Sequence, residues 1–344
     1  MLLNSKKKIN AAGIFSSVHV IESTLRNGVL PDGLSNAATA VVESLKINVI
    51  SERTYRGRPM VIKRRNPYGA KMADMTNLYF RLAKLPIRYL SDLDEWRRWE
   101  VGCFLMLNGD RYRAAAARKN AVRLDKIPGR NLWDHMKQGT LTRHMLQAAG
   151  REIHRAHQFW SDKLSGRWSH GDASMPNVIF EEGSGRARLI DFEIRHDESL
   201  PVVTRQADDL LVFLLDMVGN ISSRHWLPFT TSFLRAYGDA DVIAELKKQL
   251  VIPSGLALLW WNVRTNFAKS ATVARRLTSL RKAIGQLDLY PLASGARRRQ
   301  KRRPSKTCQT RSAGTPTAKS RTRASREIAK AVPPGMPSRL PMTR

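Results

Sequence analysis

The segment 168–192 constrains the fold of this chain more than any other. It carries His170-Gly171-Asp172, then Asn177 five residues beyond the aspartate, then Asp191-Phe192-Glu193. Short apolar stretches on either side of a Gly-Ser-Gly turn predict two strands between Asn177 and Asp191. The segment therefore predicts a polar loop followed by a strand pair that ends on an aspartate.

These residue types suit phosphoryl transfer. That reaction needs a carboxylate to orient and deprotonate the acceptor hydroxyl, metal ligands, and a cation on the phosphates. Asp172 can serve as the base while the amide oxygen of Asn177 reaches a metal that bridges the phosphates. Asp191 adds a hard carboxylate ligand suited to Mg²⁺. A surface turn in which Asp and Asn act as caps is the alternative interpretation.

The segment resembles the kinase-like superfamily, and most closely its atypical branches: aminoglycoside phosphotransferases, choline kinases, RIO kinases and lipopolysaccharide sugar kinases. Typical protein kinases have Arg in place of Gly171 and Lys in place of Ser174. The resemblance spans about residues 50–217 and is most specific in 168–192. It implies an α+β, two-lobed protein-kinase-like fold, with a small antiparallel-sheet N-lobe and a mostly helical C-lobe.

The resemblance assigns a role to each matched position. Asp172 is expected to be the catalytic base, Asn177 and Asp191 the metal ligands, and His170 a residue that holds the loop without touching substrate. Asp208, which opens an apolar helix, is expected to hydrogen-bond the backbone of the catalytic loop. An acidic helix N-terminus favoured by the helix dipole is the alternative for Asp208. ATP and Mg²⁺ are the implied cofactors, with GTP left open as the donor.

A lysine and a glutamate upstream are expected to hold the nucleotide phosphates. Lys63, at the end of a predicted strand, resembles the lysine that contacts the α- and β-phosphates. Apolar residues at helical spacing predict a helix over 93–108. Glu100 on this helix is the expected partner of Lys63, and Glu95 is the alternative.

Four further positions are expected to contact the nucleotide. The stretch 123–129 resembles the hinge between lobes, where backbone groups of Asp125 and Ile127 pair with the adenine edge. The stretch 50–54 stands where a glycine-rich loop is expected but contains no glycine. Phosphate contacts there are expected from Ser51, Thr54 and backbone N–H groups.

The segment after Asp191 argues against a protein substrate. Glu193 replaces the glycine of the Asp-Phe-Gly motif, and Asp208 follows Asp191 by only seventeen residues. A long activation segment has no room there, so a sugar, a lipid-linked glycan or another small molecule is the expected acceptor. An atypical serine/threonine protein kinase and a pseudokinase that binds nucleotide without turnover are the alternatives.

Composition adds the expected partners and location. The net charge of +30 favours anionic partners, and residues 296–344 are especially basic and poor in large apolar residues. Expected units are an extension 1–40, an N-lobe 41–122, a C-lobe 123–295 and a basic disordered tail 296–344 that binds an anionic membrane surface or nucleic acid. The two cysteines and the short apolar runs favour a cytoplasmic location, with the inner membrane face as an alternative.

Overall fold

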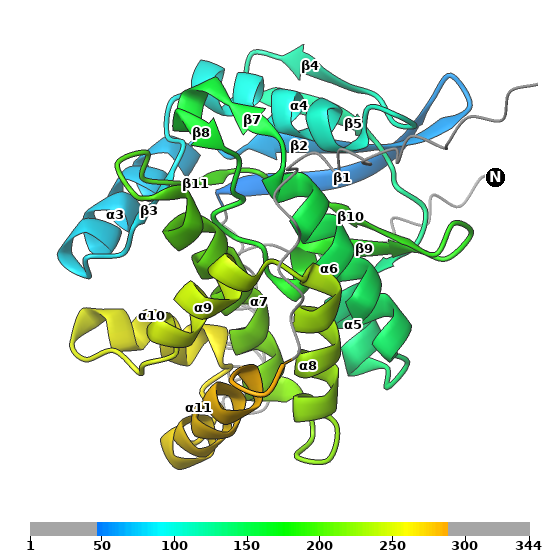
Figure 1. Cartoon of the computed structure of the whole chain (residues 1–344). Coiled ribbons are helices and arrows are strands. Elements are labelled where there is room, and N and C mark those ends of the chain that lie inside the picture. Colours follow the sequence, from blue (N-terminus) through cyan, green and yellow to red (C-terminus); the bar gives the residue numbers. More distant parts are fainter. Residues whose placement is uncertain (1–46, 288–344) are drawn as a thin grey trace, which may run out of the picture. The chain divides into compact units, whose positions relative to one another are not determined.

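The computed structural model of the chain describes residues 47–287. The expected extension 1–40 and basic tail 296–344 lie outside the described residues. The described part begins with an antiparallel sheet and continues into a mostly helical region, as Figure 1 shows. We refer to residues 47–125 as the N-lobe and to residues 130–287 as the C-lobe. The α+β class predicted from the sequence is confirmed.

The N-lobe contains a four-stranded antiparallel sheet in the order β1-β2-β5-β4. A two-residue turn, Arg56-Gly57, joins the first two strands, and both of its residues have positive φ, as tight hairpin turns require. The strands are β1 (Asn48–Tyr55), β2 (Arg58–Arg65), β4 (Ala114–Arg118) and β5 (Ala121–Asp125). Strand β1 therefore covers the whole stretch 50–54 and continues to Tyr55.

Helix α4 (Leu93–Asn108) packs against β4 and β5 and confirms the predicted helix. Asp92 caps its first turn by accepting a hydrogen bond from the Glu95 N–H at 2.7 Å. The buried face carries Trp96, Glu100, Cys103, Phe104 and Leu107, which recur at helical spacing. Glu100 is thus held inside the fold by its apolar neighbours.

A second small sheet joins the two lobes. Strand β3 (Ile87–Tyr89) follows helix α3 (Gly69–Leu82) and pairs with β11 (Ile194–His196) in the antiparallel direction. Phe80, Tyr89 and Ile194 share one buried cluster there. The pairing fixes the chain directly after Asp191-Phe192-Glu193, so this segment is a strand rather than a long loop.

The predicted strand pair of the C-lobe is also confirmed. Strands β9 (Val178–Glu181) and β10 (Arg186–Leu189) form a hairpin, and the short β6 (Arg130–Asn131) pairs with β9. A second hairpin, β7 (Trp160–Ser161) and β8 (Gly166–Arg167), encloses the 3-10 turn η1 (Asp162–Leu164). The 3-10 turn η2 (Met175–Asn177) leads from the His170 loop into β9.

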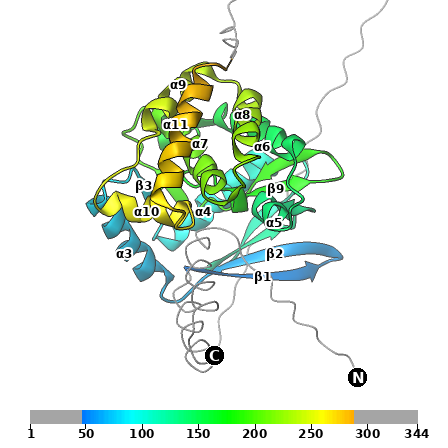
Figure 2. The same ribbon diagram turned by 90° about the horizontal axis from the view of Figure 1, so that it is seen from below.

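Helix α7 (Val202–Asn220) is the centre of the helical region. Its residues 205–207 and 209–218 are buried, and α8, α9, α10 and α11 all contact it. Figure 2 shows the β1–β2 hairpin on one side of the molecule and these helices on the other. The other helices are α5 (Leu132–Lys137), α6 (Arg143–His157), α8 (Trp226–Tyr237), α9 (Ala240–Gln249), α10 (Leu256–Arg264) and α11 (Ser270–Ile284).

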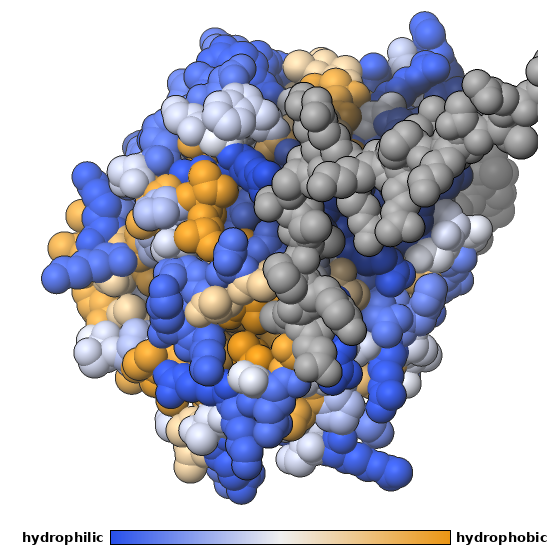
Figure 3. Space-filling model, viewed as in Figure 1, coloured by the Kyte–Doolittle hydropathy of each residue, from blue (hydrophilic) through white to orange (hydrophobic). Residues whose placement is uncertain are grey.

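The described surface is mostly hydrophilic, with scattered apolar patches (Figure 3). This matches the strongly charged composition, because charged side chains are buried only at a cost in free energy. Within residues 47–287, no helix combines the length and apolarity that crossing a bilayer demands.

Gly150 lies inside α6, where a glycine weakens an isolated helix. The structure supplies the reason for it: a Cβ at this position would lie 2.5 Å from the carbonyl oxygen of Phe233 on α8. Helices α6 and α8 therefore pack at a distance that only glycine permits.

We predict opposite effects for two Gly→Ala substitutions in helices. Gly150→Ala should lower the free energy of unfolding by about 1–3 kcal/mol, because the new methyl group forces α6 and α8 apart. Gly102→Ala on α4 meets no atom within 4 Å and should raise it by up to about 1 kcal/mol. Urea unfolding of both variants measures this, and stabilisation by Gly150→Ala would contradict the packing argument.

Candidate active site

A cleft of about 290 Å³ lies between the N-lobe sheet and the β9–β10 hairpin. Apolar side chains line part of it, including Val61 and Leu124 from the sheet and Ile179 and Ile190 from the C-lobe. Charged side chains, Lys63, Glu100 and Asp191, line it as well. An apolar slot with a few convergent charges is typical of a site for a nucleotide-sized ligand.

Lys63 is surrounded by three carboxylates. Its Nζ lies 3.2 Å from Glu100 Oε2 and 3.7 Å from Glu193 Oε2, and it forms an ion pair with Asp191 Oδ1. Burial alone would lower the pKa of Lys63, but the charges of Asp191, Glu100 and Glu193 raise it above its ordinary value. The lysine is therefore fully charged at neutral pH.

The structure places Glu100, not Glu95, beside Lys63. Glu100 also accepts a hydrogen bond from the backbone N–H of Phe192 at 3.1 Å. Glu95 instead pairs with Arg195 at 3.2 Å. Since Glu100 contacts both the lysine and the residue after Asp191, one side chain ties α4 to β2 and to the end of the β9–β10 hairpin.

Glu193 is a member of this cluster that the sequence did not predict. Its side chain points inward, accepts a hydrogen bond from Asn48 and lies 3.8 Å from Arg65 Nη1. Burial raises the pKa of Glu193 to about 7, although Lys63 lowers it. One signal for a further buried carboxylate was present in the sequence. Arg65 follows Lys63 by two residues and so shares its buried face of β2, and two buried cations on one face require acidic partners.

Asp172 and Asn177 lie side by side in the loop before β9. The amide nitrogen of Asn177 donates to the Asp172 carbonyl at 2.9 Å and to its Oδ2 at 3.2 Å. This orientation leaves the buried Asn177 Oδ1 without a hydrogen-bond partner among residues 47–287. The N–H of Ile190 donates to the Asn177 carbonyl at 3.0 Å, which brings Asp191 next to this loop.

Asp191 adopts a left-handed backbone conformation with φ 67°. Such a conformation costs a non-glycine residue about 1–3 kcal/mol and is concentrated at functional sites. It turns the chain at the end of the strand so that the carboxylate reaches Lys63. No residue pattern around Asp191 predicted this bend.

His170 connects the loop to the strand that precedes Asp191. Its Nε2 lies 3.0 Å from the Ile190 carbonyl, and the Asp172 N–H donates to its Nδ1 at 3.2 Å. These contacts require a neutral ring protonated on Nε2, and burial lowers the pKa of His170 accordingly. The side chain is 1% exposed, so it contacts the loop and not the cleft.

Asp209, not Asp208, holds the backbone of the loop. Its two carboxylate oxygens accept hydrogen bonds from the N–H groups of His170 at 2.7 Å and Gly171 at 2.8 Å. Asp208 pairs with His196 at 3.1 Å instead. The expectation for Asp208 was wrong by one position, because the helical phase of α7 turns the second of two consecutive aspartates toward the loop.

The contacts of Asp209 make its carboxylate unusually acidic. Burial alone would raise the pKa of Asp209, but His196, His157 and His170 lower it to about 2. Gly171 completes the arrangement with φ 84°, where a Cβ would lie 3.0 Å from the Ile194 carbonyl oxygen. The loop is thus held on one side by α7 and on the other by β11.

The two hinge residues differ in what they offer a ligand. Both line the cleft, but the N–H of Asp125 already donates to the Arg113 carbonyl at 2.8 Å. Within residues 47–287, the N–H of Ile127 donates to no backbone carbonyl of the sheet or turns. Ile127 is therefore the position with a backbone donor free for a ligand edge.

Ser51 and Thr54 do not line the cleft. Side chains alternate along β1, so Ile50 and Glu52 face the cleft and Ser51 faces away. Thr54 lies further out and is exposed. The cleft residue of this stretch is Glu52, which pairs with Lys126 of the hinge segment at 2.6 Å.

The donor set suits a divalent cation of the Mg²⁺ type. Among the described residues, no group of three or more His, Cys, Asp or Glu side chains is arranged to hold a metal. Asn177 and Asp191 instead offer an amide oxygen without a partner and a carboxylate beside it in the fold. One or two protein oxygens, completed by phosphates and water, are the usual coordination of Mg²⁺ in phosphoryl transfer.

Comparisons with known proteins give distant structural similarity only. No family model matches the chain, and no curated protein matches it in sequence. An ethanolamine kinase from Plasmodium vivax is 8% identical with a TM-score of 0.38, over 81% of this chain and 95% of that one. Rv3197 from Mycobacterium tuberculosis, in complex with erythromycin, is 16% identical with a TM-score of 0.33, over 70% of each chain. The activity of this chain is therefore inferred from its own side chains.

We predict that Asp209→Asn destabilises the protein more than Asp208→Asn. A pKa of about 2 in the folded state, against about 3.9 in an unfolded chain, corresponds to about 2–3 kcal/mol of stability near pH 7. This contribution is present above pH 4 and is lost as the pH falls toward 2, because the folded state must then protonate Asp209. Asp208 pairs with a single histidine, so Asp208→Asn should lower the free energy of unfolding by less.

Urea unfolding at pH 7, 5 and 3.5 measures both variants. The gap between wild type and Asp209→Asn should hold from pH 7 to 5 and narrow at pH 3.5. Equal losses for the two substitutions at pH 7 would contradict the assignment of the loop contacts to Asp209.

Proposed function

We propose that this chain is an ATP- and Mg²⁺-dependent phosphotransferase that moves the γ-phosphoryl group to a hydroxyl of a non-protein acceptor. One observation carries the proposal: Lys63 with Glu100, and the loop of Asp172 and Asn177, meet at Asp191. Phosphoryl transfer requires a cation that contacts the phosphates, a base, and oxygen ligands for the metal ion.

Asp172 is proposed as the base. It lies in a loop that His170 and Asp209 hold through backbone contacts, and its Oδ2 accepts a hydrogen bond from Asn177. The carboxylate accepts the proton of the acceptor hydroxyl as the new O–P bond forms. A base fixed in this way needs little reorganisation during the reaction.

The cleft is proposed to hold the nucleotide. Its apolar walls suit the adenine ring, and the free N–H of Ile127 suits the acceptor nitrogen on the adenine edge. Lys63 would turn its charge to the phosphates, with Glu100 keeping it in place. Asn177 and Asp191 would hold Mg²⁺, which neutralises charge on the phosphates when it is bound.

The acceptor is proposed to be a sugar, a lipid-linked glycan or another small molecule. The chain leaves Asp191 through β11, whose pairing with β3 occupies the region of an activation segment. Only ten residues, 192–201, separate Asp191 from the start of α7. So few residues leave no room for a surface that docks an extended peptide. This favours a small-molecule acceptor over a protein.

We predict that purified protein transfers the γ-phosphoryl group of ATP to a component of a small-molecule or lipid fraction of a cell extract. Asp172→Asn should lower the rate by about 10²–10⁴-fold, because it removes the general base. Lys63→Ala should mainly weaken ATP binding. Asp241→Asn, an exposed change on α9, is the matched control and should leave the rate unchanged.

Transfer of ³²P from [γ-³²P]ATP, followed by thin-layer chromatography, measures these rates. Full activity of Asp172→Asn would exclude the proposed mechanism. Tight ATP binding without transfer to any extract fraction, and without transfer to water as acceptor, would identify a nucleotide-binding pseudokinase instead. Labelling of protein alone would favour a protein kinase.

A further inference from the structure

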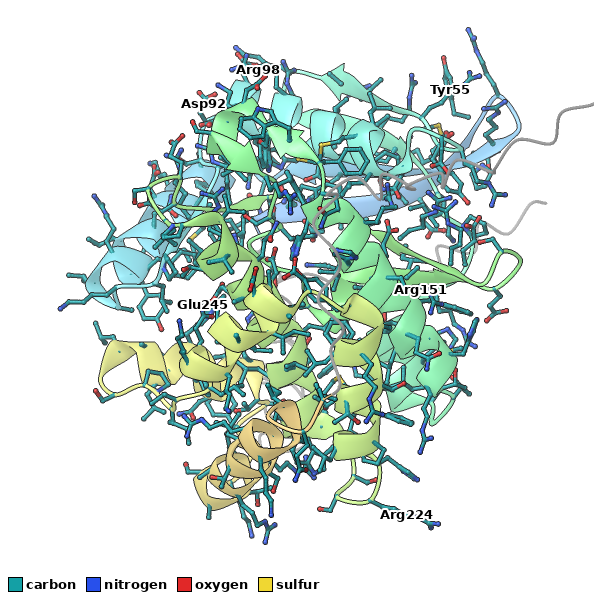
Figure 4. All side chains as sticks on the ribbon, viewed as in Figure 1. Tyr55, Asp92, Arg98, Arg151, Arg224 and Glu245 are labelled. Atoms are coloured by element: carbon teal, nitrogen blue, oxygen red, sulfur yellow. The ribbon has the colours of Figure 1, made fainter. Side chains whose placement is uncertain are left out.

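Arg264 is buried beside the proposed base. Its Nη2 lies 2.7 Å from Asp172 Oδ1, and the two side chains are 2% and 4% exposed. By contrast, Arg98, Arg151 and Arg224, which are labelled in Figure 4, are exposed. Burying a guanidinium costs free energy, so an arginine placed here requires a partner of opposite charge.

Aromatic and helical packing holds Arg264 in place. It is the last residue of α10, and its guanidinium carbon lies 4.4 Å from the centroid of the Trp260 ring, one helical turn earlier. Trp260 in turn packs on Phe80 of α3, with ring centroids 5.2 Å apart. The position of Arg264 is therefore set by the fold rather than by its charge partner alone.

The hydrogen-bonding capacity of this arginine is largely unused. Arg264 Nε and Nη2 have no hydrogen-bond partner among residues 47–287, and neither does Asp172 Oδ1. Arg264 and Asp172 are close, yet their atoms are not aligned for a hydrogen bond. Buried N–H groups left unpaired cost about 1–3 kcal/mol each, so these donors suit a further oxygen ligand.

A second carboxylate lies within the electrostatic reach of Arg264. Asp216 of α7 accepts a hydrogen bond from the Met175 N–H at 2.9 Å, and its Oδ1 is also unpaired among the described residues. Burial raises the pKa of Asp216 to about 7, although the Arg264 charge lowers it. The region around the base thus has one buried cation and unsatisfied polar atoms from three separate elements.

The loop itself supplies no cation to the acceptor side of the reaction. Residues 170–177 contain neither Lys nor Arg, and Ser174 is buried. Lys63 is held by Glu100 and Asp191 on the nucleotide side. In residues 47–287, Arg264 is the cation that forms an ion pair with Asp172.

We propose that Arg264 is a catalytic residue that donates hydrogen bonds to the transferring phosphoryl group, an inference that rests on the proposed phosphotransferase function. The acceptor oxygen forms a bond to the γ-phosphorus as its proton passes to Asp172. The bond from that phosphorus to the bridging oxygen breaks, and ADP leaves with the electron pair. Negative charge on the phosphoryl oxygens then faces the Arg264 guanidinium, which turns from Asp172 toward it.

Intrinsic hydrolysis of ATP tests this without knowledge of the acceptor, because water then takes the acceptor position. Single-turnover hydrolysis of Mg-ATP by Arg264→Ala should be about 10²–10³-fold slower than by wild type, the usual cost of one lost transition-state donor. Arg264→Lys should recover part of the rate. Affinity for a fluorescent ATP analogue should change less than about threefold, since the loss falls on the transition state.

Arg276→Ala is the matched control for loss of a buried arginine. Arg276 on α11 lies over Trp226, as Arg264 lies over Trp260. It donates a hydrogen bond to the Val218 carbonyl, and neither of these two contacts involves the loop 170–177. It should lower the melting temperature to a similar degree and leave the rate of hydrolysis near that of wild type. Millimolar guanidinium should raise the rate of Arg264→Ala only, a response that a purely structural role does not produce.

The outcomes separate this inference from the proposed function. If wild type binds Mg-ATP and hydrolyses it in an Asp172-dependent way, but Arg264→Ala is as fast or faster, Arg264 restrains the base and the inference is wrong. Failure of guanidinium rescue together with an equal rate loss in Arg276→Ala also overturns it. If wild type neither binds nor hydrolyses ATP, the proposed function fails and the inference fails with it.

Discussion

The buried charge of Lys63 is the interaction on which the described structure depends most. Three carboxylates, from α4 and from both sides of Phe192, converge on one ammonium group. They come from two distant parts of the chain, α4 and the segment 191–193, so the ion cluster links β2, α4 and the strand end at Asp191. Removing one partner from such a buried cluster leaves an uncompensated charge and costs about 3–5 kcal/mol. The same cluster sets the charges that a bound phosphate would meet.

A second network, made of hydrogen bonds, connects this ion cluster to the helical region. Asp209 of α7 holds the loop backbone, and His170 ties that loop to the strand before Asp191. The most buried helix of the C-lobe is thereby joined to the loop that carries Asp172. The support of the site comes from the core, which is the arrangement that a positioned base requires.

The sequence predicted the loop, the strand pair after it and the helix that carries Glu100 because their signal is local. Asp172, Asn177 and Asp191 lie on one loop and one hairpin, and the helix carrying Glu100 has a clear apolar face. Errors arose where the answer depends on phase or on distant packing. Helical phase decides which of the two adjacent aspartates of α7 faces the loop. Strand alternation decides which residues of β1 face the cleft.

Two contacts between distant elements of the site were not predicted. Glu193 and Arg264 reach the site through an inward turn and through a helix with no readable motif. The reason for Gly150 inside α6, the close approach of the Phe233 carbonyl on α8, lies eighty-three residues away in the sequence. Periodicity reports which face of an element is buried, but not what covers it.

Titration calorimetry with ATP, with and without Mg²⁺, tests the central claim most directly. That claim is that Lys63 and Asp191 together place the phosphates of a metal-bound nucleotide. Mg²⁺ should strengthen ATP binding to wild type, and Asp191→Asn should abolish that gain, because it removes the metal's carboxylate ligand. ATP binding that is equally strong with and without Mg²⁺, or a gain from Mg²⁺ that persists in Asp191→Asn, would contradict it.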